Sequence, residues 1–238
     1  MKIMVISDLH YEFGSHHGID QSDAWNWLLS IVDYHRPDLL LSCGDWGHAV
    51  NSRDFFKLLN KTIVLGIYGN HDNIEVLKNL YNIRTSEYLP VLMEDGKVYI
   101  VYGTRITGIN GIISSKREIR NGVPRKIFQD FIETAKKLED ESIDILLIHA
   151  IPAIKEIYPD IRVSRATLAV LKTIRIIQPK IVFNGHLHRS CYAIYKFNDI
   201  RTIYIRIDSS QRYRCYSIYD TDNEELEVWS DFERKMTL

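Results

Sequence analysis

Short apolar runs, each closed by a polar turn, recur along the first 190 residues of this chain. Five of these runs are rich in Ile, Val and Leu and too short for helices, which is typical of buried strands. They lie at residues 2–7, 38–43, 62–68, 142–148 and 180–183. Between the first three runs, residues 20–36 and 52–60 carry apolar side chains at helical spacing. The resulting β-α-β-α-β order predicts parallel strands joined by crossover helices.

The later part of the chain combines helices with antiparallel strands. Helical patterns cover residues 73–81, 124–140 and 164–178, and Pro124 and Ser164 stand where the last two would begin. Residues 97–102 and 105–110 flank a Gly-Thr turn and predict a hairpin. Four alternating runs close the chain at residues 191–197, 202–207, 213–219 and 226–229. Because no linker or low-complexity tract interrupts the chain, we expect residues 1–238 to form a single domain of mixed α/β class, close to α+β.

Polar side chains that can bind metals follow five of the predicted strands. They are Asp8 and His10, Asp45, Asn70 with His71, His149, and His186 with His188. Alternate residues of an extended chain share a face, so the two members of a D-x-H or H-x-H pair can point the same way. The carboxyl ends of the strands of an α/β sheet are also where ligands bind. These side chains are therefore expected to meet at one edge of the sheet.

The predicted ligand set mixes nitrogen and oxygen and lacks a thiolate. Such a set suits Mn²⁺ or Fe and also allows Zn²⁺. Seven candidate ligands remain besides His71, which is too many for one tetrahedral zinc ion and about right for two divalent ions that share a carboxylate. Each motif alone has a simpler interpretation, because Gly-Asn is common in turns and Asp often caps them. The interpretation as a metal centre rests on all five motifs together.

The ordered motifs resemble those of the calcineurin-like metallophosphoesterases. They are DLH at 8–10, GD at 44–45, GNHD at 69–72, His149 and GHLH at 185–188. The resemblance spans about residues 1–190, and the segments GING at 108–111 and HAIP at 149–152 are similar to those of small phosphodiesterase-type members. Many relatives have His or Gly and two prolines after the His149 position, whereas this chain has Ala150 and Ile151 before Pro152. That departure affects the subgroup and removes no ligand.

The resemblance implies a fold and an activity. The family fold is a β-sandwich of two mixed sheets flanked by helices on both outer faces, in four layers. One metal would be held by Asp8, His10 and His188, and the other by Asn70, His149 and His186, with Asp45 as the bridge. A metal-activated water would then hydrolyse a P–O bond of a phosphate ester. His71 would act as general acid or stabilise phosphate charge, and Asp72 would orient it.

Several further side chains are candidates for contact with a phosphate. Arg189 follows the last ligand, and His16 and His17 lie in a segment after the first motif. Residues 114–126 carry five cations, among them Arg117, against the single acid Glu118. Such a charge run is usually a solvated loop, and its alternative role is to meet a phosphate-bearing substrate.

Composition narrows the classes of partner. The chain has 30 basic and 31 acidic residues, so a nucleic-acid partner is possible but not favoured. Three widely spaced cysteines without a CxxC pair argue against a disulfide framework and favour a reducing, cytoplasmic location. Cys43 is expected to pack in its strand. No apolar run approaches the length of a membrane span, so no membrane partner is expected.

Three functions follow from these observations. The leading one is a dinuclear phosphodiesterase that acts on a small-molecule or nucleotide ester. The second is a nuclease, suggested by the basic segment and opposed by the balanced charge. The third is a non-catalytic scaffold with the same fold, which the presence of His71 opposes because scaffolding relatives have lost active-site residues of this kind.

Overall fold

The computed structural model describes residues 1–16 and 18–238, and its strands form two six-stranded sheets in that part of the chain. The first has the order β16-β15-β14-β1-β4-β5 and the second the order β12-β13-β11-β10-β7-β6. The first sheet contains β1 (Lys2–Ile6), β4 (Leu39–Ser42), β5 (Ile63–Gly66), β14 (Cys215–Asp220), β15 (Glu225–Ser230) and β16 (Glu233–Thr237). The second contains β6 (Tyr99–Val101), β7 (Thr104–Ile109), β10 (Ile145–Ile148), β11 (Ile181–Asn184), β12 (Tyr192–Lys196) and β13 (Ile203–Ile207).

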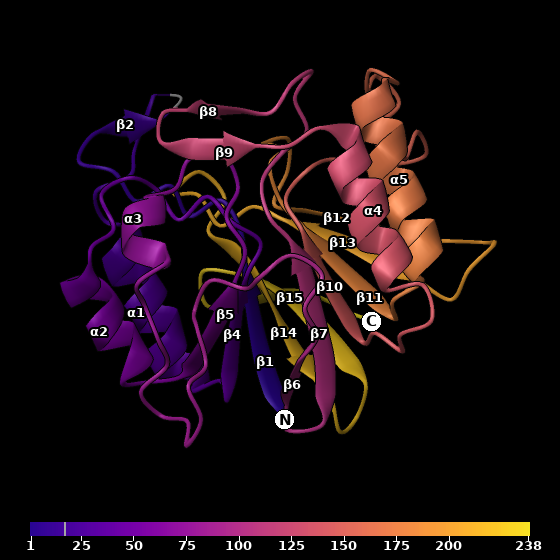
Figure 1. Ribbon diagram of the computed structural model, residues 1–238. Helices are drawn as coiled ribbons and strands as arrows, with labels where there is room; N and C mark the ends of the chain where they lie inside the picture. Colours follow the sequence, from indigo (N-terminus) through magenta and orange to yellow (C-terminus); the bar gives the residue numbers. More distant parts are fainter. Residues whose placement is uncertain (17) are drawn as a thin grey trace.

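Helices cover the outer face of each sheet. Figure 1 shows α1 (Ala24–His35), α2 (Ser52–Leu59) and α3 (Ile74–Leu77) on one side, and α4 (Phe128–Lys137) and α5 (Arg165–Ile177) on the other. Two short hairpins complete the described elements, namely β2 (Ser15–His16) with β3 (Ile19–Asp20), and β8 (Glu118–Arg120) with β9 (Val123–Arg125). The expected four-layer sandwich of two mixed sheets is confirmed.

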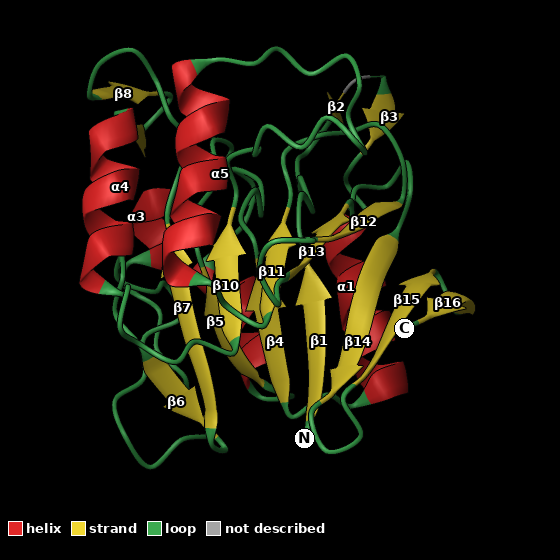
Figure 2. Ribbon diagram, turned by 90° about the vertical axis from the view of Figure 1, so that its right-hand side faces the viewer, coloured by secondary structure: helices red, strands yellow, loops and turns green. Residues whose placement is uncertain are grey.

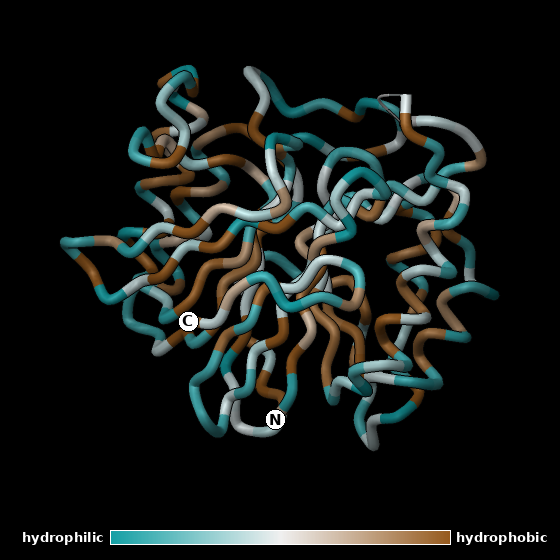
Figure 3. Tube along the Cα trace, turned by 180° about the vertical axis from the view of Figure 1, so that it is seen from behind, coloured by the Kyte–Doolittle hydropathy of each residue, from teal (hydrophilic) through white to brown (hydrophobic). Residues whose placement is uncertain are grey.

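Alternation along the strands explains why the layers stack. In β1, Met4 and Ile6 join the apolar cluster under α1 and α2, whereas Ile3 and Val5 join the cluster between the two sheets. A third cluster lies between the second sheet and the helices α4 and α5. Figure 3 shows the apolar strands inside and the hydrophilic connections outside. Each sheet is thus buried on both faces, which is why its central strands read as continuous apolar runs.

The parallel strands bring their carboxyl ends to one edge of the sandwich. In the first sheet β1 runs parallel to β4 and β4 to β5, and in the second β7, β10, β11 and β13 run parallel in turn. Figure 2 shows these strands pointing the same way, toward the loops that carry the predicted ligands. None of the described helices has the length and apolar character needed to cross a membrane.

Three expectations from the sequence are wrong. The strand over residues 202–207 was expected to be antiparallel, but β13 is antiparallel only to β12 and runs parallel to β11. Pro124 does not begin a helix: it lies in β9, paired with Ile119, and α4 begins at Phe128 after Ile127, whose backbone N–H donates to Asp130. A two-stranded hairpin has free edges, so it tolerates a residue without an N–H. The cysteines are not all free either, since Cys191 and Cys215 form a disulfide and only Cys43 is a free, buried thiol.

Candidate metal centre

The predicted ligands meet where the two sheets come together at their carboxyl ends. Their donor atoms fall into two sets: Asp8, His10 and His188 form one, and Asp45, His149 and His186 form the other. Each set combines a first-sheet strand end with a second-sheet strand end. The sandwich therefore has to close before either set exists.

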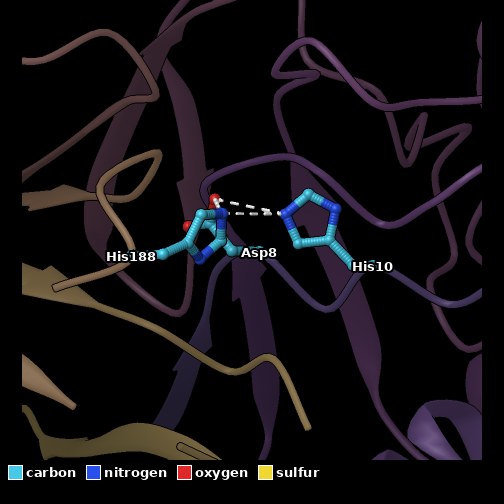
Figure 4. A group of neighbouring side chains, drawn as sticks. All are labelled: Asp8, His10 and His188. Carbon is cyan, nitrogen blue, oxygen red and sulfur yellow. Dashed lines mark hydrogen bonds and ion pairs between the residues drawn. The ribbon is translucent and has the colours of Figure 1, made fainter. Parts of the chain in front are cut away.

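The first set is compact and almost fully enclosed. The Nε2 atoms of His10 and His188 are 3.2 Å apart, and each lies within 3.8 Å of a carboxylate oxygen of Asp8. Figure 4 shows both rings turned toward that carboxylate. Two imidazole nitrogens bound to one ion at about 2.1 Å would be roughly 3.0–3.4 Å apart, so the observed spacing fits a shared metal.

The second set adjoins the first through Asp45. Its Oδ2 atom lies 3.3 Å from His149 Nε2 and 3.7 Å from His10 Nε2, a member of the first set. His186 Nδ1 is 3.2 Å from His149 Nε2. A buried carboxylate between two groups of imidazole nitrogens is what a bridging ligand requires.

Asn70 adds an oxygen donor at the same place. Its backbone N–H donates to Asp45 Oδ1 at 2.5 Å, which fixes the residue beside the second set. Its side-chain Oδ1 is buried and accepts no hydrogen bond from the described residues. Because a buried carbonyl oxygen is costly to leave without a partner, this atom fits a metal ligand.

The outer nitrogens of two histidines are held by hydrogen bonds. His149 Nδ1 lies 2.8 Å from the carbonyl oxygen of Cys43, so this nitrogen donates and Nε2 is left as the ligand atom. His188 Nδ1 lies 2.8 Å from Asp208 Oδ2, which has the same effect. Such partners fix the tautomer of a metal-binding imidazole and raise its basicity.

Asp208 was not among the residues singled out from the sequence. It is buried and comes directly after β13, which runs parallel to β11. It therefore lies at the carboxyl end of a parallel strand, as the other strand-end residues do, but the sequence predicted an antiparallel strand at residues 202–207, where this rule does not apply.

The backbone at the site takes a conformation that side chains rarely adopt. Asp8, His10, Asp45 and His186 all have positive φ, between 51° and 72°. Residues in this region cluster at functional sites because the surrounding structure has to hold them there. Gly185 shows how tight the packing is, since a Cβ atom there would overlap with Ser7 Oγ.

The electrostatics of the site favour cations. Burial alone would raise the pKa of Asp8 and Asp45, but the surrounding histidines hold the pKa of both carboxyls below the usual value. Burial would likewise lower the pKa of His149, whereas Asp45 and Asp8 raise it to about 9. Burial and the neighbouring His149 lower the pKa of His186 to about 4. Two buried anions that draw protons onto a neighbouring imidazole would draw a metal ion in the same way.

Comparison with known proteins decides the family. The model of the calcineurin-like phosphoesterases matches residues 1–190. The chain belongs to this family. No curated protein matches it.

Solved structures support the same fold for this family member. The protein TT1561 of Thermus thermophilus aligns with a TM-score of 0.68 and 15% identity, covering 96% of this chain and 98% of that one. GAP50, the anchor in the inner membrane complex of Plasmodium, aligns with a TM-score of 0.59 and 11% identity, covering 100% of this chain and 87% of that one. At these identities the likeness shows the fold alone.

His71 lies at the rim of the candidate metal centre. Its ring is 5.3 Å from that of His10 and 6.0 Å from that of His48, between centroids. Burial lowers the pKa of His71 against the charge of Asp45, which acts to raise it. The backbone N–H of His71 donates to Asp45 Oδ1 at 2.7 Å, so the same carboxylate positions this residue and Asn70.

Asp72 is buried and connects two loops of the candidate centre through hydrogen bonds. Its carboxylate accepts hydrogen bonds from the backbone N–H groups of Asp45, Trp46 and Gly69 at 2.6–3.0 Å. Burial and repulsion from Asp45 raise the pKa of Asp72 against these three donors. Its contacts thus join the GD and GNHD loops, which carry ligands from neighbouring strands.

The other candidates for phosphate contact are Arg189, Arg117, His16 and His17. Arg189 is ion-paired with Asp160 on the surface. Arg117 is exposed and its guanidinium donates to both carboxylate oxygens of Asp130. His17 lies outside the described residues, and the backbone of His16 belongs to β2.

Proposed function

We propose that this phosphoesterase is a dinuclear metal-dependent phosphodiesterase that acts on a small-molecule or nucleotide ester. The observation that carries the proposal is the position of Asp45, whose carboxylate lies between two separate His/Asp groups. The family match and the enclosed, anionic character of the site support it.

Seven residues would hold the two ions. Asp8, His10 and His188 would bind one, and Asn70, His149 and His186 the other, with Asp45 between them. Mn²⁺ or Fe suits this donor set best, and Zn²⁺ is also compatible. Once bound, the two ions would supply Lewis acidity toward the phosphoryl oxygens and a water of lowered pKa.

His71 is the group of this chain that would handle the proton of the reaction. Its ring is half-buried at the rim of the centre, where an ester would approach. A protonated imidazole could give its proton to the leaving oxygen, and a neutral one could donate a hydrogen bond to a phosphoryl oxygen. Asp72 would act through the backbone, by fixing the loop from Gly69 to His71 relative to Asp45.

A phosphodiester of a small molecule or nucleotide is favoured over a nucleic acid as substrate. Of the five cations in residues 114–126, three lie within ion-pairing distance of carboxylates. A nuclease would need such charges free for the phosphate backbone. A cytoplasmic location is a further expectation. The disulfide is compatible with it in a hyperthermophile, since disulfides are common inside such cells and rare in other cytosols.

The test is hydrolysis of bis(4-nitrophenyl) phosphate beside 4-nitrophenyl phosphate, with Mn²⁺ added to metal-stripped protein. We expect turnover that requires the metal, favours the diester and falls at least about 100-fold in His71→Ala, the scale of general acid catalysis. Metal content measured after gel filtration serves as the control for the variant. Absence of turnover with two ions bound per chain would contradict the proposal and favour a scaffold.

A further inference from the structure

The β8–β9 hairpin stands over the carboxyl ends of the strands, on the side of the metal centre (Figure 1). It is anchored at its base, where the backbone of Lys126 bonds to Ile112 and to Ser114. The neighbouring Gly111 N–H donates to the carbonyl of Tyr68 at 2.6 Å. Tyr68 directly precedes the GNHD loop, so the hairpin is held close to the segment that carries Asn70 and His71.

The five cations of residues 114–126 fall into two kinds, and Lys116, which lies 3.9 Å from Glu118, belongs with the paired ones. Arg117 and Lys126 are held by Asp130 and Asp95, outside the hairpin, and therefore serve to fix it. Lys126 also donates to the carbonyl of Asn110 at 2.8 Å. Arg120 and Arg125 form no ion pair with any residue in the described part of the chain. Their charges are the ones left for a ligand.

Arg125 is the one of these two that faces inward. It is partly buried, whereas Arg120 is exposed, and its Nε atom is enclosed without a hydrogen-bond partner among the described residues. Burial and repulsion from Arg120 lower the pKa of Arg125, and the carboxylates of Glu118 and Asp45 oppose the shift. Arg125 lines the same pocket as Tyr68, the residue directly before the GNHD loop, which connects this guanidinium to the segment that carries Asn70 and His71.

A pocket of about 460 Å³ adjoins Arg125. Its walls include Tyr68 and the apolar side chains of Ile119 and Pro124. Two carboxylates also line it, Asp130, which is paired with Arg117, and Glu118, which lies 3.9 Å from Lys116. Ile119 is 74% exposed, so its side chain is open to contact with a ligand. The arrangement combines a free cation with an aromatic and aliphatic wall, as a site for an anion with an apolar substituent would.

We propose that the β8–β9 hairpin forms the substrate subsite of the enzyme, in which Arg125 contacts the phosphate and the adjoining pocket receives the organic group of the ester that is not displaced. This inference rests on the proposed function and names its substrate class: phosphodiesters whose retained group is apolar or aromatic. Arg125 takes the role that the sequence alone suggested for Arg117. A guanidinium suits this role because its fork of donors matches two phosphate oxygens.

The first test measures binding of inorganic phosphate to the Mn²⁺-loaded protein by isothermal titration calorimetry. Arg125→Gln should raise the Kd for phosphate about 10- to 100-fold, the range expected for loss of a charge-assisted hydrogen bond. Arg125→Lys should recover part of the loss, because the charge returns without the fork. Lys116→Gln removes a charge from the exposed start of the same segment and serves as the matched control. Equal Kd values for Arg125→Gln and Lys116→Gln would overturn the proposal.

The second test compares two diesters with the same 4-nitrophenyl leaving group, one retaining a phenyl group and the other a methyl group. The wild type should prefer the phenyl ester in kcat/KM, and Ile119→Ser should reduce that preference several-fold. Arg125→Gln should lower kcat/KM for both esters alike. An unchanged ratio in Ile119→Ser would refute the pocket.

The two tests separate this inference from the proposed function. If the wild type hydrolyses neither diester, the proposed activity is wrong, whereas the phosphate affinities still decide the role of Arg125. If the wild type hydrolyses diesters and Arg125→Gln behaves like Lys116→Gln in both assays, the subsite is wrong and the activity stands.

Discussion

Asp208→Asn should selectively weaken one of the two metal sites. Asp208 Oδ2 accepts the Nδ1 proton of His188 at 2.8 Å, and its Oδ1 accepts the backbone N–H of Ser210 at 3.0 Å. The introduced amide keeps its oxygen on Ser210, so its NH₂ group faces His188 Nδ1. That nitrogen must then accept, which places the imidazole proton on Nε2, the atom that points to Asp8.

The size of the effect follows from this change of tautomer. Loss of a partner to a metal-binding histidine typically costs 10- to 100-fold in metal affinity, or about 1.4–2.7 kcal/mol. The upper end applies here because Asp208 is buried and because Asp208 and Asp8 raise the pKa of His188 against the effect of burial. The site of Asp45, Asn70, His149 and His186 should keep its affinity.

The assay is Mn²⁺ titration of metal-stripped protein by calorimetry, with two binding steps resolved. Asp199→Asn is the matched control, since Asp199 is an exposed partner of Arg175 and does not adjoin any ligand in the sequence. Equal weakening of both steps, or no weakening of either, would refute the argument that Asp208 fixes the tautomer of His188.

Three further predictions concern stability and packing. Cys191→Ser/Cys215→Ser opens a loop with a sequence separation of 24 and should lower the free energy of unfolding by about 3.5 kcal/mol on the loop-entropy relation; a urea midpoint that does not change would contradict it. His35 is buried, and burial together with the charge of Lys2 lowers its pKa to about 4. The unfolded chain therefore binds more protons than the folded one between pH 6.5 and 4. The free energy of unfolding should fall by about 2 kcal/mol when the pH is lowered from 7 to 5. His35→Gln, compared with the wild type in chelator-treated protein, should reduce that dependence. Gly185→Ala places a Cβ in steric conflict with Asp8 Oδ2 and should lower Mn²⁺ affinity while secondary structure, followed by circular dichroism, is kept; full affinity would show that the loop can shift.

Most of the fold and of the ligand set could be predicted because the signals are local. The apolar run of β1 and the Asp8 that follows it lie within a few residues, so strand and ligand are visible in one stretch. The same holds for Ser164, which caps α5 as expected by accepting the N–H of Thr167. Asp208 was missed because the strand before it was predicted to be antiparallel, and its parallel pairing with β11 depends on residues that are distant in the sequence.

Other features were decided only by the tertiary structure, because their partners are distant in the sequence. The sequence shows five cations in residues 114–126, but only the fold brings Asp130 to Arg117 and Asp95 to Lys126 and leaves Arg125 without an ion pair among the described residues. The disulfide needs Cys191, directly before β12, and Cys215 of β14 to lie 5.4 Å apart between Cα atoms, although the two strands belong to different sheets.

The sequence by itself determined which residues could bind metals, since strand ends and glycine turns are set by neighbours. Closure of the sandwich decided how they combine: His188 from the second sheet meets Asp8 from the first, and Asp45 comes to lie between the two groups. These distances depend on packing two sheets face to face, which no local pattern encodes. The candidate metal ligands could therefore be identified from the sequence, whereas the folded structure alone decided which charged side chains pair with one another.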